Sequence, residues 1–190
     1  GSCTTNCVSP MIKVLHDAFG VKNANFVTTH AYTATQRLID AADKKDYRRG
    51  RAAAMNIAPS TSGASQSVVE SIPELHGKIA GYALRVPVVD GSIASVVATV
   101  LKETSAEEVN EVFKERALKD MKEILDYTED QIVSSDIIHH PASCIIDGGM
   151  TSVIDDTVSI AGWYDNEWGY SNRLVDVANL LVKNKKFGLF

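Results

Sequence analysis

Apolar residues near the start of the chain recur with helical spacing. They are Val8, Met11, Ile12, Val14, Leu15, Ala18 and Phe19. This stripe predicts an amphipathic helix that ends at Gly20, and Pro10 is expected near its first turn, so that it begins between residues 6 and 9. Cys3 would then lie just before the helix N-terminus, where free N–H groups favour a thiolate. Cys7, on the helix itself, is expected to be a small buried packing residue.

Several later stretches are β-branched or alternate between apolar and polar residues. They predict strands over residues 25–30, 78–88, 92–101, 131–136, 143–147, 150–154 and 157–164. Asp90 and Gly91 stand between the second and third of these strands, which favours a hairpin there.

Three more helices complete the pattern. A turn over residues 56–63 opens a short helix that ends before Pro73, and Ser105 begins a helix that reaches about residue 118. An amphipathic helix occupies about residues 166–184. Runs of strands with helices beside them indicate an α+β fold, with a largely antiparallel or mixed sheet and helices on one face.

A polar segment over residues 31–51 interrupts this pattern and ends in Tyr47-Arg48-Arg49-Gly50-Arg51. Irregular loops of some twenty residues inside a compact domain are usually functional. The alternative is a solvated linker with scattered charge.

Composition limits the class of protein. The chain has 190 residues, 45% hydrophobic and 23% charged, as in a water-soluble globular domain. Its net charge of −5 argues against nucleic acid or an anionic membrane as partner, and no apolar run approaches the roughly 18 residues that span a bilayer. Three cysteines are too few for a disulfide framework, so a reducing compartment is expected.

Cys3 and His30 form a candidate nucleophile and base, since a thiol attacks as the thiolate and an imidazole can take its proton. Spacing alone is weak evidence for such a pair. The other histidines, His16, His76, His139 and His140, are interpreted as structural. No thiol or carboxylate near the adjacent His139 and His140 completes a metal ligand set.

Four separated segments carry a family resemblance. They are Ser2-Cys3-Thr4-Thr5-Asn6-Cys7, His30-Ala31-Tyr32-Thr33-Ala34-Thr35-Gln36, Leu84-Arg85-Val86-Pro87 and Trp163-Tyr164-Asp165-Asn166-Glu167-Trp168-Gly169-Tyr170-Ser171-Asn172-Arg173. In order and interval they resemble the catalytic, C-terminal domain of the phosphorylating glyceraldehyde-3-phosphate dehydrogenases, over essentially all 190 residues. The resemblance implies that residues 1–190 are one catalytic domain. The Rossmann domain, which carries most of the NAD or NADP site, is expected to be absent from this chain, which contains no Gly-x-Gly-x-x-Gly.

The resemblance implies a role for each candidate residue. Cys3 attacks glyceraldehyde 3-phosphate to form a thiohemiacetal, hydride leaves to nicotinamide, and inorganic phosphate cleaves the resulting thioester to 1,3-bisphosphoglycerate. His30 acts as the base. The attacking phosphate is assigned to Ser2, Thr4, Ser62 and Gly63 with Arg49 as helper, the substrate phosphate to Thr33 and Arg85, and the nicotinamide carboxamide to Asn166 with Tyr170 packed behind it.

Simpler interpretations of some residues stay open at this point. Arg85 could be a strand arginine paired with a surface carboxylate, and the hydroxyl of Ser62 could cap a helix, which is compatible with binding an anion. Trp163, Tyr164 and Trp168 are interpreted as core aromatics.

Some positions depart from the commonest family pattern. Ser62 stands where threonine is usual, and Gln66 where lysine is usual. Asp40-Ala41-Ala42 lacks the proline of many NAD-dependent members and the serine of many NADP-dependent ones, which leaves the choice of cofactor open. The resemblance also implies a cytoplasmic homotetramer, and we expect no dehydrogenase turnover by this chain without a Rossmann half.

Three alternatives remain. An erythrose-4-phosphate dehydrogenase would use the same thiol and imidazole, although Thr33 with Ser62 and Gly63 favours the triose enzyme. A non-catalytic oligomerisation or binding module would not need Cys3, His30, Thr33 and Arg85. A cysteine hydrolase would need an asparagine or aspartate to orient the histidine, and no motif supplies one.

Overall fold

The strands of the computed structural model, which describes residues 1–44 and 46–183, form one mixed sheet. They are β1 (Val21–Ala31), β2 (Ala58–Thr61), β3 (Ile79–Val86), β4 (Ser92–Val100), β5 (Leu125–Thr128), β6 (Cys144–Ile154) and β7 (Thr157–Tyr164). Their spatial order in the described residues is β2-β3-β1-β4-β7-β6-β5. The pairs β1–β3 and β5–β6 are parallel and the other pairs are antiparallel. The expected α+β fold with a mixed sheet is therefore confirmed.

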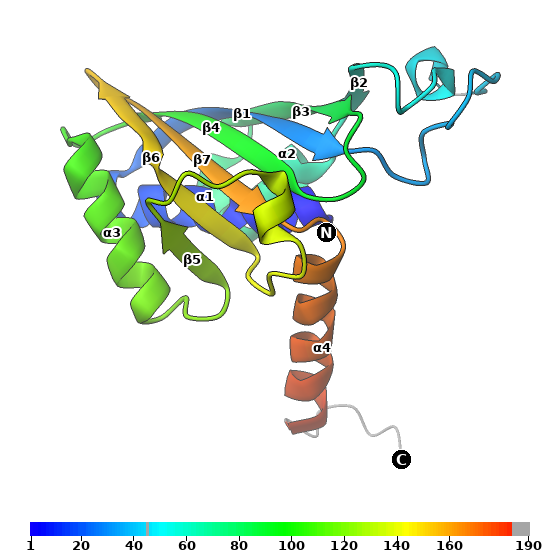
Figure 1. Ribbon diagram of the computed structural model, residues 1–190. Helices are drawn as coiled ribbons and strands as arrows, with labels where there is room; N and C mark the ends of the chain where they lie inside the picture. The colour runs from blue at the N-terminus through cyan, green and yellow to red at the C-terminus, as the bar shows by residue number, and fades with distance from the viewer. Residues whose placement is uncertain (45, 184–190) are drawn as a thin grey trace.

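Helices cover one face of this sheet. They are α1 (Cys3–Phe19), α2 (Ala64–Ser71) and α3 (Ala106–Leu118), whereas α4 (Trp168–Lys183) points away from the sheet (Figure 1). Short 3-10 turns lie at Tyr47–Gly50, Pro73–Leu75 and Ser134–Ile137. Within the described residues, no helix is both long enough and apolar enough to span a bilayer.

The core lies between the sheet and α1. Along β4 the residues at positions 92, 94, 96, 98 and 100 are buried, and the residues between them are half-buried or exposed. This alternation is that of a sheet with one covered face. Cys7 is fully buried in the core, as expected.

The first helix begins earlier than expected. The side chain of Ser2 accepts a hydrogen bond from the Thr5 N–H at 3.1 Å, so this cap starts α1 at Cys3 and not between residues 6 and 9. Pro10 consequently lies in the helix interior, where its nitrogen has no proton to donate. The free-energy cost of this missing hydrogen bond is offset by the burial of apolar surface, because the neighbouring Val8 and Met11 are completely buried.

The predicted hairpin across Asp90 and Gly91 is wrong. Strand β1 lies between β3 and β4 and pairs with both. The connection over residues 87–91 therefore spans two strand spacings, about 9.5 Å, which a two-residue turn cannot bridge.

Other expected boundaries also differ. Residues 131–136 form no strand, and β5 was missed because four residues carry too short a pattern. Residues 143–147 and 150–154 belong to one strand, β6, whose register with β7 shifts between Asp147 and Ser152. The expected turn over residues 56–63 contains β2, and the last helix begins at Trp168, while the expected end at 184 lies outside the described residues.

Close packing between α1, β6 and β7 gives a stability prediction. A Cβ added at Gly162 would lie 2.5 Å from the Cys144 sulfur and 2.9 Å from the Met11 sulfur. We expect Gly162→Ala to lower the free energy of unfolding by about 1–3 kcal/mol, measured by urea denaturation. In the control Gly149→Ala, the new Cβ meets only a carboxylate oxygen at 3.4 Å, and a change within about 0.5 kcal/mol is expected. Equal losses in both variants would contradict this packing.

Candidate active site

The structure brings Cys3 and His30 together. Cys3 is the first residue of α1, and His30 is near the end of β1, on the sheet face that α1 covers. The Cys3 Sγ lies 3.3 Å from the His30 Nε2. The sulfur and imidazole are therefore within reach for proton transfer.

Both groups are neutral at pH 7 in the ligand-free chain. Burial, and then the positive charge of Arg85, lower the pKa of His30 to about 4. Burial raises the pKa of the Cys3 thiol, and the Thr4 N–H and Arg85, which favour the thiolate, do not compensate. The expectation of a resting thiolate is therefore wrong, because the desolvation of the sulfur outweighs the helix N-terminus.

The proton of His30 is assigned from its neighbours. Nδ1 lies 2.7 Å from the Ala31 carbonyl oxygen and 2.6 Å from a terminal nitrogen of Arg85. Arginine only donates, so Nδ1 cannot satisfy both contacts as hydrogen bonds. We assign the proton to Nδ1, which then donates to the Ala31 carbonyl, and Nε2 accepts from the Cys3 thiol. Arg85 then donates to the same carbonyl at 3.1 Å.

His30 has no carboxylate or side-chain amide at Nδ1 among the described contacts. Its ring is held instead by a backbone carbonyl and by the Tyr164 ring, whose centroid is 5.8 Å away at an edge-to-face angle of 79°. The orienting side chain of a cysteine hydrolase is therefore missing from this contact set.

One arginine contacts the imidazole, and a second lies near the first. Arg85 is the register partner of His30 on β3 and contacts His30 and Ala31, not a surface carboxylate. Arg49 lies near enough that its charge helps to lower the pKa of Arg85, after burial. The Nε atoms of both are buried without a hydrogen-bond partner. The Nε of Arg49 faces the Asp46 carboxylate at 3.7 Å, whereas the Nε of Arg85 has no such partner and suits a phosphate oxygen.

Thr33 follows β1 in a turn organised by Gln36. The Gln36 carbonyl oxygen accepts from the Thr33 N–H at 2.8 Å and from its hydroxyl at 3.2 Å. Gln36 is buried, a signal that the sequence analysis missed because glutamine is usually a surface residue.

The residues assigned to the attacking phosphate differ in position, because the hydroxyls of Ser2 and Ser62 lie at helix starts and that of Thr4 lies in the core. The Ser2 hydroxyl caps α1, and the Ser62 hydroxyl accepts from the Ala64 N–H at 3.2 Å at the start of α2, beside Gly63. The Thr4 hydroxyl is buried 3.0 Å from that of Tyr164. The hydroxyl of Thr4 is thus bound within the core, so a phosphate role for Thr4 is left to its N–H.

Tyr164 was expected to be a core aromatic and is one, but its hydroxyl belongs to the site. Besides Thr4 it contacts the Thr28 hydroxyl at 2.7 Å, so it ties α1 to β1 beneath the sulfur. Trp163 is half-buried, and its indole N–H donates to Asp147. Trp168 is 47% exposed, so its expected core role is wrong, because α4 leaves the sheet at this residue.

Asn166 lies at the same end of the sheet as His30. Its side-chain oxygen accepts from the Ser92 hydroxyl at 2.8 Å, and its side-chain nitrogen is buried without a partner. That free donor fits a carboxamide oxygen. Tyr170 lies near Gly1 and lines a hollow of about 260 Å³ with residues of α1. The contacts among the described residues do not place Tyr170 against Asn166.

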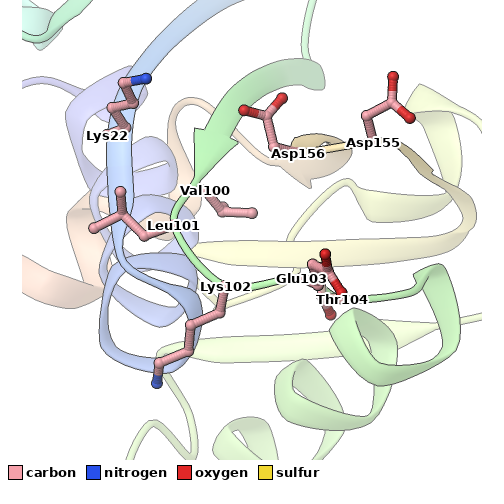
Figure 2. Close-up of a pocket in the computed structure, with 8 residues that line it drawn as sticks. All are labelled: Lys22, Val100, Leu101, Lys102, Glu103, Thr104, Asp155 and Asp156. Carbon is pink, nitrogen blue, oxygen red and sulfur yellow. The ribbon is translucent and has the colours of Figure 1, made fainter.

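A second hollow, of about 660 Å³, lies at the other end of the sheet. Figure 2 shows its lining residues, Lys22, Val100, Leu101, Lys102, Glu103, Thr104, Asp155 and Asp156. Val100 ends β4 about 27 Å from Ser92, at about 3.4 Å per residue. This hollow is therefore separate from the thiol.

Known proteins resemble this chain along most of its length. Residues 2–166 match the family described as "Glyceraldehyde 3-phosphate dehydrogenase, C-terminal domain". A glyceraldehyde-3-phosphate dehydrogenase 2 of Streptomyces avermitilis is 52% identical over 93% of this chain and 52% of its own length. The Mycobacterium leprae glyceraldehyde-3-phosphate dehydrogenase is 49% identical over 96% of this chain and 54% of its own. The chain spans about half the length of these relatives.

Thiol alkylation tests the charge balance at the site. Cys7 and Cys144 are fully buried, so iodoacetamide should label Cys3 first, at a rate that still rises above pH 9 because the Cys3 pKa is raised. Arg85→Gln removes a charge that favours the thiolate and should slow labelling roughly three- to tenfold at pH 8, whereas Arg85→Lys should slow it less. Peptide mass spectrometry measures both rates. A labelling rate that is already constant from pH 6 to 9 would mean a preformed thiolate.

Proposed function

The chain belongs to the glyceraldehyde-3-phosphate dehydrogenase family, and we propose that residues 1–190 are the catalytic domain of a phosphorylating enzyme of that kind. Its reaction is the oxidation of glyceraldehyde 3-phosphate to 1,3-bisphosphoglycerate. The observation that carries the proposal is the 3.3 Å contact between the Cys3 sulfur and His30 Nε2, with the Arg85 guanidinium beside the ring.

Cys3 and His30 divide the covalent chemistry. His30 Nε2 takes the thiol proton as the sulfur attacks the aldehyde carbon, and it returns the proton to the aldehyde oxygen to give a thiohemiacetal. His30 then accepts the hydroxyl proton as the carbon is oxidised to a thioester. Finally an oxygen of inorganic phosphate attacks the thioester carbon, the Cys3 sulfur leaves, and it takes back the proton from His30. A low pKa keeps His30 unprotonated and ready for the first step.

Arg85 and Thr33 are proposed to hold the substrate phosphate, and Ser2, Ser62, Gly63 and the Thr4 N–H the attacking phosphate. Support for the first set is the unused Nε of Arg85 beside His30. Support for the second is that these residues begin α1 and α2, where N–H groups face outward. Arg49 is proposed to help to bind the attacking phosphate, because it lies close enough to Arg85 for its charge to lower the pKa of Arg85.

NAD or NADP is the proposed cofactor, held here by Asn166 and, more loosely, by Tyr170. The buried, unpartnered nitrogen of Asn166 fits the carboxamide of a nicotinamide. When bound, the nicotinamide supplies the two-electron acceptor for the oxidation of the thiohemiacetal. The rest of the nucleotide would be held by a domain that these residues do not contain.

We further propose a homotetramer that works in the cytoplasm. Free thiols at all three cysteines suit a reducing compartment. The apolar residues exposed along α4 suit a helix that is covered by another domain in the assembled enzyme.

Acyl transfer tests the proposal without any cofactor. Run in reverse, the last step has the Cys3 sulfur attack 1,3-bisphosphoglycerate, release phosphate and form a thioester, which mass spectrometry detects. We expect the adduct on Cys3 and its removal by added inorganic phosphate. Cys3→Ser should abolish the thioester, and His30→Asn should slow its formation by about 10²–10⁴.

The exposed histidine variant His76→Asn, remote from the sulfur, is the control and should acylate at the normal rate. A chain that forms no acyl adduct on Cys3, or forms it equally in His30→Asn, would contradict the proposed function. A non-catalytic module predicts that outcome.

A further inference from the structure

Ser92 lies between Ala31, the residue after His30, and Asn166, the proposed cofactor ligand. It is the first residue of β4, is 1% exposed, and pairs in register with Tyr164 of β7. The β1–β4 ladder ends one position earlier, at the pair Thr29 and Ile93. The Ser92 side chain therefore lies where backbone pairing with the end of β1 has stopped.

The Ser92 hydroxyl makes two buried hydrogen bonds. It accepts from the Ala31 N–H at 3.1 Å and lies 2.8 Å from the side-chain oxygen of Asn166. The carbonyl oxygen of Ala31 in turn lies 2.7 Å from His30 Nδ1. One hydroxyl thus connects the N–H of the His30–Ala31 peptide to the side-chain amide of Asn166.

These contacts decide which way the Asn166 amide faces. A hydroxyl has one proton, and in a buried site that proton must find an acceptor. With the Ala31 N–H as donor on one side, the proton is donated to the oxygen of Asn166. The amide nitrogen, the atom without a partner, is then turned away from Ser92.

We propose that Ser92 is a positioning residue: it fixes the Asn166 amide with both N–H donors toward the cofactor, so that the site recognises a carbonyl oxygen. The inference rests on the proposed function for its ligand, the carboxamide of a nicotinamide dinucleotide. The same hydroxyl also accepts from the Ala31 N–H.

Removal of the Ser92 hydroxyl tests whether it positions Asn166. Joined to the part of the Mycobacterium leprae relative that this chain does not span, Ser92→Ala should raise the KM for NAD about three- to tenfold, the value of one neutral hydrogen bond. Its kcat should change less than about twofold, since Cys3 and His30 remain. Ser95→Ala is the matched control, because Ser95 is exposed on the same strand, and it should change neither constant.

A double-mutant cycle identifies the residue through which Ser92 acts. In an Asn166→Ala background there is no amide to orient, so adding Ser92→Ala should raise the KM no further. An equal increase in both backgrounds, or a loss of kcat at unchanged KM, would overturn the proposal.

NMR spectroscopy detects the same contacts in the absence of cofactor. In the 190-residue chain, Ser92→Ala should speed hydrogen exchange of the Ala31 amide and shift the Asn166 side-chain amide signals, while Ser95→Ala should do neither. Unchanged signals would overturn the proposal. Absence of turnover in the unaltered joined protein would count against the proposed function instead, and these signals would still decide whether Ser92 holds both groups.

Discussion

The contact between a helix start and a strand end organises this domain. Cys3 faces His30 because Ser2 caps α1 at this point and β1 runs beneath it, tied by the Tyr164 hydroxyl to Thr4 and Thr28. The contact joins residues 27 positions apart, so it exists only when the core between α1 and the sheet is packed. Acid–base chemistry and fold stability therefore depend on the same burial.

Burial also sets the protonation of the site. A helix N-terminus and Arg85 both favour a thiolate, but the desolvated sulfur stays protonated, and the imidazole is neutral as well. Two neutral partners can exchange a proton during attack, which suits a base that acts twice in one turnover. Burial, and then the charge of Arg85, keep His30 unprotonated, and the Nε of Arg85 is left as a donor for an anion.

Sequence patterns predicted the parts of the fold that depend on local periodicity. The boundaries of β7 and the helix that Ser105 begins, α3, are confirmed, because alternation and caps are local signals. The pairing of β3 and β4 was wrong because the turn signal at Asp90 does not reveal that β1 lies between them. At the site, motifs indicated Cys3, His30 and Arg85. They could not reveal the raised pKa of Cys3 or the link through Ser92, since both depend on burial and on contacts between distant residues.

The most direct test of the account is the titration of His30 by NMR in the unaltered chain, with its signals assigned by their loss in His30→Asn. The apparent pKa of His30 should be about 4, so its ring signals should stay constant from pH 5.5 to 8. A His30 ring that titrates above pH 7 would mean that the imidazole is charged at neutral pH, and it would contradict the neutral pair on which the proposed chemistry rests.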